Sequence, residues 1–416
     1  MKVSGIEWIG EIPEDWEVTP LGQCFSERNE KVSDYDFEPL SVTKQGIVKQ
    51  LESVAKSNNH DDRKKVCVND FVINSRSDRK QSCGISPYDG SVSVINIVLN
   101  NKALSPLYVK YLLDNYGFAE EFYRWGTGIV ADLWSTRYDR MKRIMLPIAP
   151  KEKQEQIGSF LDQKVSAIDN ILEKTKVSIE EYKKYKQSII TEVVTKGLNP
   201  DVEMKDSGIE WIGEIPKHWE VKKMKYLSKL NQKVLSENTD EDYLFRYVDI
   251  SSVTLEKGIE RYELLKYADA PSRARRIVEE GDIIISTVRT YLKAIASVKD
   301  DENVVVSTGF AVLTPYDINS LYLEYFCKST PFINIITAHS TGVSYPAINS
   351  SSIMDFKVVI PSTEEQQQIA DYLDNKCLEI DNLIAKKEQL LLELESYKKS
   401  LIYECVTGKR GLQQLK

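Results

Sequence analysis

The sequence predicts an α+β protein in which two duplicated mixed α/β domains are held apart by two long antiparallel helices forming a coiled coil, with pseudo-twofold symmetry. The first observation is a repeat: SGIEWIGEIP stands at residues 4–13 and again, 203 positions on (207 minus 4), at 207–216. The second is a matching pair of long heptad patterns. The third is the composition of the segments between the arms and the heptad patterns. There, short runs rich in Val and Ile alternate with Gly, Asn, Asp and Ser, which is typical of strands and turns.

The repeated arm sets the domain organisation. Residues 15–18 (DWEV) follow its first copy and residues 218–221 (HWEV) follow its second. The match is too long to arise from shared residue preferences, so it indicates a duplication. A chain of 416 residues is long enough for each half to bury its own core. We expect an arm (1–18), a first α/β domain (19–149), a first long helix (150–198), a linker with the second arm (199–221), a second α/β domain (222–361), a second long helix (362–408) and a tail (409–416).

Within the α/β domains the two halves keep a common plan. Val66–Asn74 and Ser91–Leu99 are predicted strands, and Pro106–Asn115 is a predicted short helix. In the second half, residues 281–286 (GDIIIS) stand opposite residues 69–74 (NDFVIN). Between such anchors the sequences barely resemble each other, which indicates a shared frame with divergent loops.

Each long helix is predicted from a seam of residues that recur in steps of three and four. At about 40–45 residues, each would be roughly 60–65 Å long. Lys164 and Lys376 also occupy seam positions and are expected to fix the register of the two helices. The predicted seam is Ile157, Leu161, Ile168, Ile171, Tyr182, Tyr185 and Ile189 in the first helix, and Ile369, Leu373, Ile380, Leu383, Leu390, Leu394, Tyr397 and Leu401 in the second.

Composition excludes several classes of protein. A net charge of -8 argues against a protein that coats nucleic acid without regard to sequence, so any DNA contact has to come from local basic clusters. The N-terminus lacks the apolar core of a signal peptide, no run spans a membrane, and a cytoplasmic location is expected. Six cysteines without a CxxC pair suggest buried thiols rather than zinc ligands or disulfides.

Catalytic motifs are missing from the sequence. It contains neither GxxxxGK[ST] nor GxGxxG, and its three histidines show no metal-binding or triad spacing. We therefore expect no catalytic residue, no metal and no cofactor in this chain.

Recognition residues are expected in the divergent loops. Arg reads guanine, Asn and Gln read adenine, and Ser or Thr hold phosphates. A single surface arginine is usually just solvated, but the candidate loops fall at matching places in the two halves. The candidates are Arg76, Ser77, Arg79, Lys80, Trp125, Thr127, Arg137 and Tyr138 in the first half, and Arg273, Arg275, Arg276, Thr287, Arg289, Tyr291, Lys293, Ser340, Thr341, Ser344 and Tyr345 in the second.

These features together resemble a known family, the specificity (S) subunits of type I restriction-modification systems. The resemblance covers essentially the whole chain. It rests on the doubled GIEWIGEIPxxWEV arm, the 281–286 strand, the Ser340-Thr341-Gly342 loop, and Ile360-Pro361 leading into Glu364-Glu365-Gln366 and a long helix that closes on residues 406–409 (VTGK). The first half departs mildly, with Trp125-Gly126-Thr127-Gly128 in place of Ser-Thr-Gly.

The resemblance implies two target-recognition domains that each read one half of a bipartite, asymmetric site in double-stranded DNA. It implies that two modification subunits dock on the helices and arms and supply S-adenosylmethionine. It further implies that restriction subunits of the full complex supply ATP and magnesium, and that this subunit is not catalytic.

Two other classes of function stay open on the residues alone. One is a purely structural scaffold joining two proteins through its helices. The other, less favoured, is a stand-alone metal-dependent nuclease.

Overall fold

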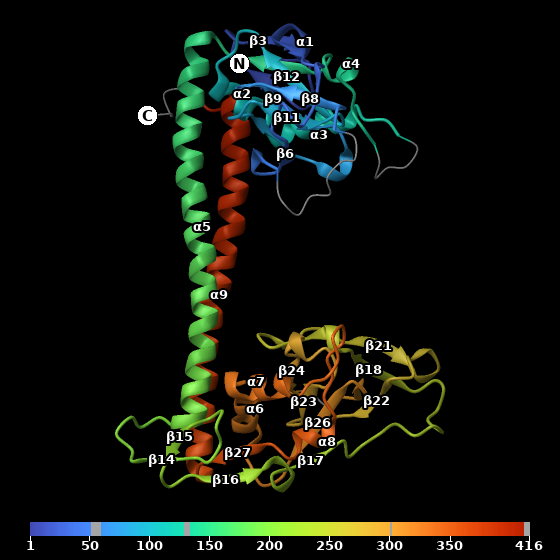
Figure 1. The fold of residues 1–416 in the computed structure, drawn as a ribbon, viewed down its shortest axis with the longest axis vertical. Helices are drawn as coiled ribbons and strands as arrows, with labels where there is room; N and C mark the ends of the chain where they lie inside the picture. Colours follow the sequence, from blue (N-terminus) through green and yellow to red (C-terminus); the bar gives the residue numbers. More distant parts are fainter. Residues whose placement is uncertain (51–59, 129–133, 300–301, 412–416) are drawn as a thin grey trace. The chain divides into compact units, whose positions relative to one another are not determined.

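The chain forms two compact units, each joining segments distant in sequence. The first unit combines Met1–Lys176 with Glu388–Lys416, and the second is Val177–Lys387. Each unit contains one arm, one α/β domain and part of each long helix (Figure 1). The predicted duplication is therefore confirmed. The computed structural model describes residues 1–50, 60–128, 134–299 and 302–411.

The α/β domain of the first unit carries two main sheets and two helices. One sheet has the order β10-β9-β12-β4 and the other β11-β8-β5, with all pairs antiparallel. Short strands β6 and β7 form a hairpin. The elements are β4 (Phe25–Glu27), β5 (Lys31–Val32), β6 (Leu40–Thr43), β7 (Gly46–Lys49), β8 (Arg63–Val66), β9 (Phe71–Asn74), β10 (Cys83–Ile85), β11 (Gly90–Ser93), β12 (Asn96–Asn101), α2 (Pro106–Leu113), α3 (Tyr116–Arg124) and α4 (Tyr138–Met141).

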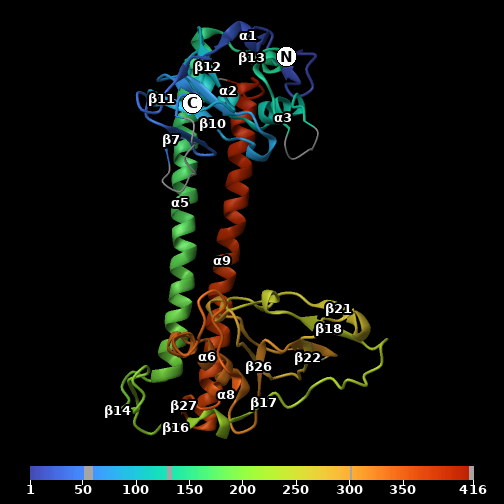
Figure 2. The same ribbon diagram turned by 45° about the vertical axis from the view of Figure 1, so that its right-hand side comes forward.

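The α/β domain of the second unit repeats this plan. Its first sheet has the order β17-β26-β23-β24, and its second β21-β18-β25-β22, in which β18 and β25 are parallel. Figure 2 shows β17, β18, β21, β22 and β26 of this domain. The elements are β17 (Ser228–Leu230), β18 (Leu244–Val248), β21 (Glu263–Lys266), β22 (Ala274–Ile277), β23 (Ile283–Ser286), β24 (Ile295–Ser297), β25 (Val304–Ser307), β26 (Phe310–Pro315), α6 (Ser320–Lys328), α7 (Thr330–Ala338) and α8 (Ser350–Ile353).

Two predicted strands are wrong, because each is two strands of different sheets. The predicted strand Val66–Asn74 contains the end of β8 and all of β9, which the chain separates by a turn at Asn69. Asn69 has φ 70°, a left-handed conformation that asparagine tolerates, and Gly281 has φ 86° at the same place in the second repeat. Ser91–Leu99 likewise spans β11 and β12. The short helix predicted from Pro106 is confirmed as α2.

Both arms are anchored in their own unit. In the first unit, Ile9, Ile12 and Trp16 are buried in the same core as the helix residues. In the second, Ile215 and Trp219 have no exposed surface. Burying a large apolar side chain contributes roughly 1.5–3 kcal/mol. Strands at the arm ends close the domains: β3 (Glu17–Pro20) pairs with β13 (Met145–Ile148), and β16 (Glu220–Lys223) pairs with β27 (Lys357–Ile360).

The start of each long helix is tied to its domain by a repeated contact. The Gln154 side chain is buried and accepts a hydrogen bond from the backbone N–H of Ser105 at 3.0 Å. Gln366, 212 positions on (366 minus 154), accepts one from the N–H of Asn319 at 2.8 Å. Each contact satisfies a backbone donor at the start of a domain helix. The domain and the long helix are therefore held in a fixed relation within each unit.

The two long helices are confirmed, α5 over Lys151–Lys196 and α9 over Thr363–Val406. In the second unit, Lys186 of α5 donates to Asp381 of α9 at 2.6 Å, and the Lys387 ammonium group lies 5.6 Å from the ring centroid of Tyr182. Residue numbers rise along one helix as they fall along the other, so the paired segments are antiparallel.

Of the fifteen predicted seam residues, eight are buried, three are partly buried and four are exposed. Ile171, Tyr185, Leu390 and Tyr397 are exposed by 47, 51, 41 and 48%. After Leu161 and Leu373, the prediction took a step of three residues where the buried residues follow a step of four, and a step of four where they follow a step of three. The buried line includes Leu161, Val165, Ile168, Leu172, Thr175 and Ile179 on α5, and Leu373, Cys377, Ile380, Ile384 and Leu401 on α9, with Leu383 and Leu394 partly buried beside it.

The predicted seam lysines are also wrong. Lys164 is exposed, and Lys376 pairs with Glu379 of its own helix at 2.7 Å. Lys186 and Lys398 stand on the true line and pair across to the other helix. The lysines that form ion pairs between the two helices are therefore Lys186 and Lys398, and not the expected Lys164 and Lys376.

Two expectations from composition can be compared with the described residues. Among them, no helix is both long and apolar enough to cross a membrane. All six cysteines are described, and each is a free thiol. The prediction of burial is confirmed for Cys83, Cys327, Cys377 and Cys405, whereas Cys24 and Cys67 are partly exposed.

Candidate DNA interface

In the first unit, the loop after β9 meets the segment after α3. Arg76 forms an isolated β-bridge with Ser135, and Ser135 forms a second one with Thr127. The backbone N–H of Thr136 donates to the carbonyl oxygen of Ser75 at 3.0 Å. Three chain segments that the sequence singled out are thus brought together at the end of the sheet.

The second unit has the same junction. Val288 bridges Ala347, and Ala347 bridges Thr341. The N–H of Ile348 donates to the carbonyl oxygen of Thr287 at 2.8 Å. Residues 75, 76, 135 and 136 correspond to 287, 288, 347 and 348 at one offset of 212, so the two junctions have the same backbone plan. We call them junction 1 and junction 2.

Around junction 1 the candidate cations lie in solvent. Arg76, Arg79, Lys80 and Arg137 are all exposed. Lys80 lies 3.4 Å from Glu120, a distance at which an exposed ion pair contributes little and leaves the ammonium group available. The backbone N–H of Ser77 donates to the carbonyl oxygen of Trp134 at 2.8 Å.

Two aromatic candidates of the first unit have internal hydrogen bonds. The indole N–H of Trp125 donates to Glu121 at 2.9 Å, and the Tyr138 hydroxyl donates to the carbonyl oxygen of Phe25 at 3.1 Å. Burial raises the pKa of Tyr138. Both side chains position the segments that carry the exposed cations.

Arg289 is exposed beside junction 2. Its guanidinium carbon lies 5.1 Å from the ring centroid of Tyr345, which is 65% exposed. Arg289 and Lys293 flank the short 3-10 turn η6 (Thr290–Leu292), and both have φ 52°. A non-glycine residue in this left-handed region costs about 1–3 kcal/mol, and such strain clusters at functional sites. Tyr291, Lys293, Thr341 and Ser344 are exposed beside it.

Other candidates of the second unit support the loop from inside. Thr287 is buried and its hydroxyl donates to the carbonyl oxygen of Gly309 at 2.8 Å. The Ser340 hydroxyl lies 2.8 Å from that of Thr290. Because their hydroxyl groups are engaged in the loop, these side chains stabilise junction 2.

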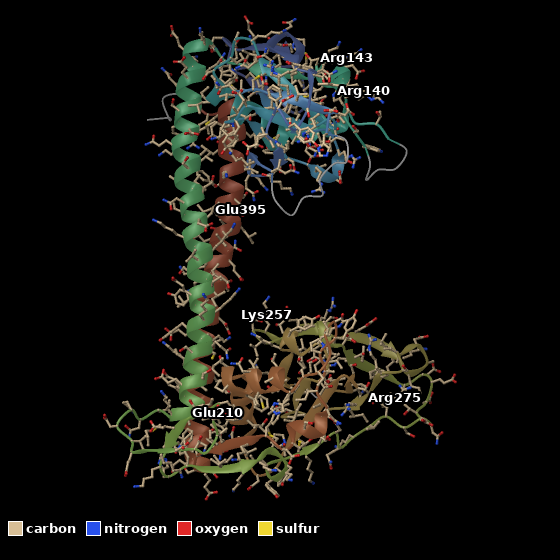
Figure 3. The ribbon with its side chains drawn as sticks, in the orientation of Figure 1. Arg140, Arg143, Glu210, Lys257, Arg275 and Glu395 are labelled. Atoms are coloured by element: carbon tan, nitrogen blue, oxygen red, sulfur yellow. The ribbon has the colours of Figure 1, made fainter. Side chains whose placement is uncertain are left out.

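The three arginines of the β22 region differ in environment. Arg273 is exposed and pairs with Asp249 at 2.9 Å, and its pKa is raised first by the hydrogen bond to Tyr247 and then by Asp249. Arg275 lies over the ring of Tyr267, with its side chain labelled in Figure 3. Arg276 is half-buried and burial lowers its pKa.

Three basic residues beside junction 1, Arg140, Lys142 and Arg143, were missed by the sequence reasoning, although Arg137 and Tyr138 of the same run were candidates. Residues 137–143 read RYDRMKR, and the side chains of Arg140, Lys142 and Arg143 are exposed on α4 and the turn after it. Figure 3 labels Arg140 and Arg143. The corresponding residues 349–355 read NSSSIMD. The run of cations was a usable signal, and its absence from the second repeat shows that the two junctions differ in charge.

Among the residues that the structure describes, no three His, Cys, Asp or Glu side chains lie close enough to hold a metal ion.

Comparison with known proteins shows which family the chain is similar to. The family model of the type I restriction modification DNA specificity domain matches residues 216–396. The type I restriction enzyme MjaVIII specificity subunit of Methanocaldococcus jannaschii is 24% identical over 430 residues, covering 97% of this chain and 95% of that protein. Over nearly its whole length the chain is similar to a type I restriction enzyme specificity subunit.

Two solved structures share the fold of this chain. A chain from a type I restriction-modification system, solved to explain complex assembly and conformational transition, has a TM-score of 0.73 at 13% identity and covers 96% of this chain and 99% of that one. The HsdS subunit from Thermoanaerobacter tengcongensis has a TM-score of 0.55 at 15% identity and covers 96% and 98%. At these identities the likeness shows the fold.

Proposed function

We propose that this specificity subunit reads a bipartite, asymmetric sequence in double-stranded DNA, using junction 1 for one half-site and junction 2 for the other. The observation that carries the proposal is the pair of equivalent bridges, Arg76 to Ser135 and Val288 to Ala347, in one backbone plan. The same scaffold presents different side chains at the same positions. A common frame with unlike reading groups suits two unlike half-sites.

The chemistry of the exposed groups fits DNA. Arginine can bind guanine through two parallel hydrogen bonds in the major groove, and arginine or lysine can neutralise phosphates. In the first domain, Arg76, Arg137 and the 137–143 run supply such cations in a chain that is acidic overall. A locally basic surface on an acidic protein favours site-specific contact over nonspecific coating.

We further propose that the arms and long helices dock two modification subunits. The buried arm residues explain part of the repeat, because packing alone requires them. Packing does not require the identical exposed carboxylates Glu7 and Glu11 in one arm and Glu210 and Glu214 in the other. A surface repeated twice fits two copies of one partner. The exposed apolar side chains of Tyr185 and Tyr397, 212 positions apart, add a repeated feature on the helices.

The chemistry is assigned to the partners. In this proposal the modification subunits bring S-adenosylmethionine, and the restriction subunits of a full complex bring ATP and magnesium, in the cytoplasm. The chain itself supplies the sequence specificity for DNA and performs no catalytic step.

Long-read mapping of methylated bases tests this function. The chain is expressed with the modification subunits of its own system in a host without other methyltransferases. The proposal predicts modification in one motif with two unlike specific parts and a fixed unread gap. Methylation at sites without any shared motif would overturn it.

A further inference from the structure

A closed loop of junction 2 holds an apolar side chain in solvent. The backbones of Thr341 and Ala347 exchange two hydrogen bonds of 2.9 Å, which close the loop at its base. We call residues 342–346 the tip of junction 2. Gly342 has φ 108°, a value that favours glycine, and a Cβ atom there would lie 3.1 Å from the carbonyl oxygen of Tyr345. Within this tight turn the side chain of Val343 is fully exposed.

The tip is joined to the turn that follows Arg289. The backbone N–H of Thr290 donates to the carbonyl oxygen of Pro346 at 3.4 Å, and the guanidinium carbon of Arg289 lies 5.1 Å from the ring centroid of Tyr345. Val343 is two residues from Tyr345, so their Cα atoms are at most about 7 Å apart. Successive base pairs of DNA are about 3.4 Å apart. The arginine and the valine are therefore close enough to contact neighbouring base pairs.

The charge around the tip favours DNA over a protein as the occupant of this surface. Residues 286–293 read STVRTYLK and residues 340–348 read STGVSYPAI, with two cations and no carboxylate in a chain whose net charge is -8. Both cations, Arg289 and Lys293, are exposed. A locally positive region on an acidic protein attracts the phosphates of DNA.

The apolar side chain matches one feature of the major groove. Thymine carries a methyl group at C5 on its major-groove edge, and apolar side chains contact this group, whereas adenine, guanine and cytosine have no methyl group there. Removing one methyl group from water corresponds to roughly a fourfold change in affinity. A valine held at a fixed place against the base edge therefore favours thymine. An adjacent arginine suits guanine, whose N7 and O6 atoms accept two hydrogen bonds.

We propose that Val343 contacts the C5-methyl group of one thymine in the second half-site, beside the base that Arg289 reads. This inference rests on the proposed function, because it needs DNA at junction 2. It adds an apolar contact to a surface otherwise made of hydrogen-bonding groups and identifies one base of the second half-site by its chemistry.

The test measures DNA binding by the full chain in complex with its modification subunits, using duplexes that carry the mapped motif. The second half-site is the half that changes when residues 222–360 are exchanged. Each thymine is replaced in turn by uracil, which differs from thymine by the methyl group alone. Val343→Ser is compared with Val234→Ser, a matched change at a valine of the same domain that is 57% exposed. Assembly of each variant with the modification subunits is measured in parallel.

One thymine of the second half-site is expected to respond. There, uracil weakens binding by the parent complex roughly 3- to 10-fold. Val343→Ser weakens binding of the thymine duplex by a similar factor and binds the thymine and uracil duplexes equally. Val234→Ser behaves as the parent chain does, and both variants assemble with the modification subunits.

The outcomes separate this proposal from the proposed function. If the parent complex binds its motif but tolerates uracil at every thymine of the second half-site, or if that half-site has no thymine, the Val343 proposal is wrong while the proposed function stands. The proposal is also wrong if Val343→Ser keeps the preference for thymine, or if this variant no longer assembles, which would make the tip a surface for protein docking. If the parent complex has no motif, the proposed function itself fails.

Discussion

The ammonium group of Lys398 lies 2.6 Å from the Oδ1 atom of Asp169, joining α9 to α5 in the first unit. The same pair recurs in the second unit as Lys186 and Asp381, also at 2.6 Å. Both residues shift by 212 positions (381 minus 169, and 398 minus 186), and the helix that supplies each charge is exchanged. An ion pair repeated in this way fixes one register of the antiparallel helices in each unit.

Reversing this pair tests its role in stability. Asp169→Lys alone places two cations in contact and should lower the free energy of unfolding by about 1 kcal/mol or less, because both side chains are partly exposed. Adding Lys398→Asp should restore most of the loss. Urea unfolding of the single and double variants measures this coupling. Equal losses in both, with no recovery, would mean that the pair contributes nothing to register.

The carboxylate of Asp162 predicts a dependence of stability on pH. The hydrogen bond from Lys110 at 2.8 Å holds the pKa of Asp162 below its usual value, and the Tyr111 hydroxyl adds a second bond at 3.0 Å. A carboxyl group with a lowered folded-state pKa stabilises the fold above its unfolded pKa, and that contribution is lost as the pH falls through the folded value.

Asp162→Asn should therefore be less stable than the parent chain at pH 7, with a difference that shrinks as the pH falls below about 4. Because the side chain is partly exposed, we expect a difference of about 1 kcal/mol or less at pH 7. Urea unfolding across this pH range measures it. A constant difference at all pH values would refute the assignment to ionisation.

Arg289 is expected to act in recognition rather than in folding. If its guanidinium group makes a bidentate base contact, Arg289→Ala should weaken binding at the second half-site by about 1–3 kcal/mol. Lys257→Ala, at an exposed residue of the same domain, is the matched control. Competition binding with duplexes altered in one half-site measures both. Arg289 would be a solvated surface residue if the two variants behaved alike.

The sequence predicted the frame of the fold because the frame is what the duplication preserves. The identical arms, the glutamines at 154 and 366 and the long helices all recur at fixed offsets. The phase of the seam was harder, because Leu383 and Ile384, like Leu390 and Leu391, are adjacent apolar residues that fit either order of steps. Burial in the three-dimensional structure decides between them.

The candidate interface was only partly predictable. Arg76 and Arg289 were identified because each lies shortly after a predicted strand. The structure places both beside the threonine-glycine segments. Hydroxyl groups such as that of Thr287 look available in sequence but are used inside the loop. The cavity beside junction 1, lined by Lys64, Asn96 and Arg137 among others, forms from segments distant in sequence, which no local pattern reveals.

The long helices predict how the unread gap is set. Adding seven residues to α5 after Ser178 and seven to α9 after Gln389 preserves the heptad phase while lengthening both. The added rise of about 10 Å corresponds to roughly three base pairs. Methylation mapping should then find the same two half-sites with a longer gap. A gap of unchanged length with methylation retained would show that the helices do not set it.

Exchange of one domain tests the central claim most directly. Residues 222–360 are replaced by the equivalent segment of a related specificity subunit with a known motif, and methylated bases are mapped in the host genome. If each junction reads its own half-site, one half of the motif changes to that of the donor, and the other half stays as it was. A motif altered in both halves would contradict the account.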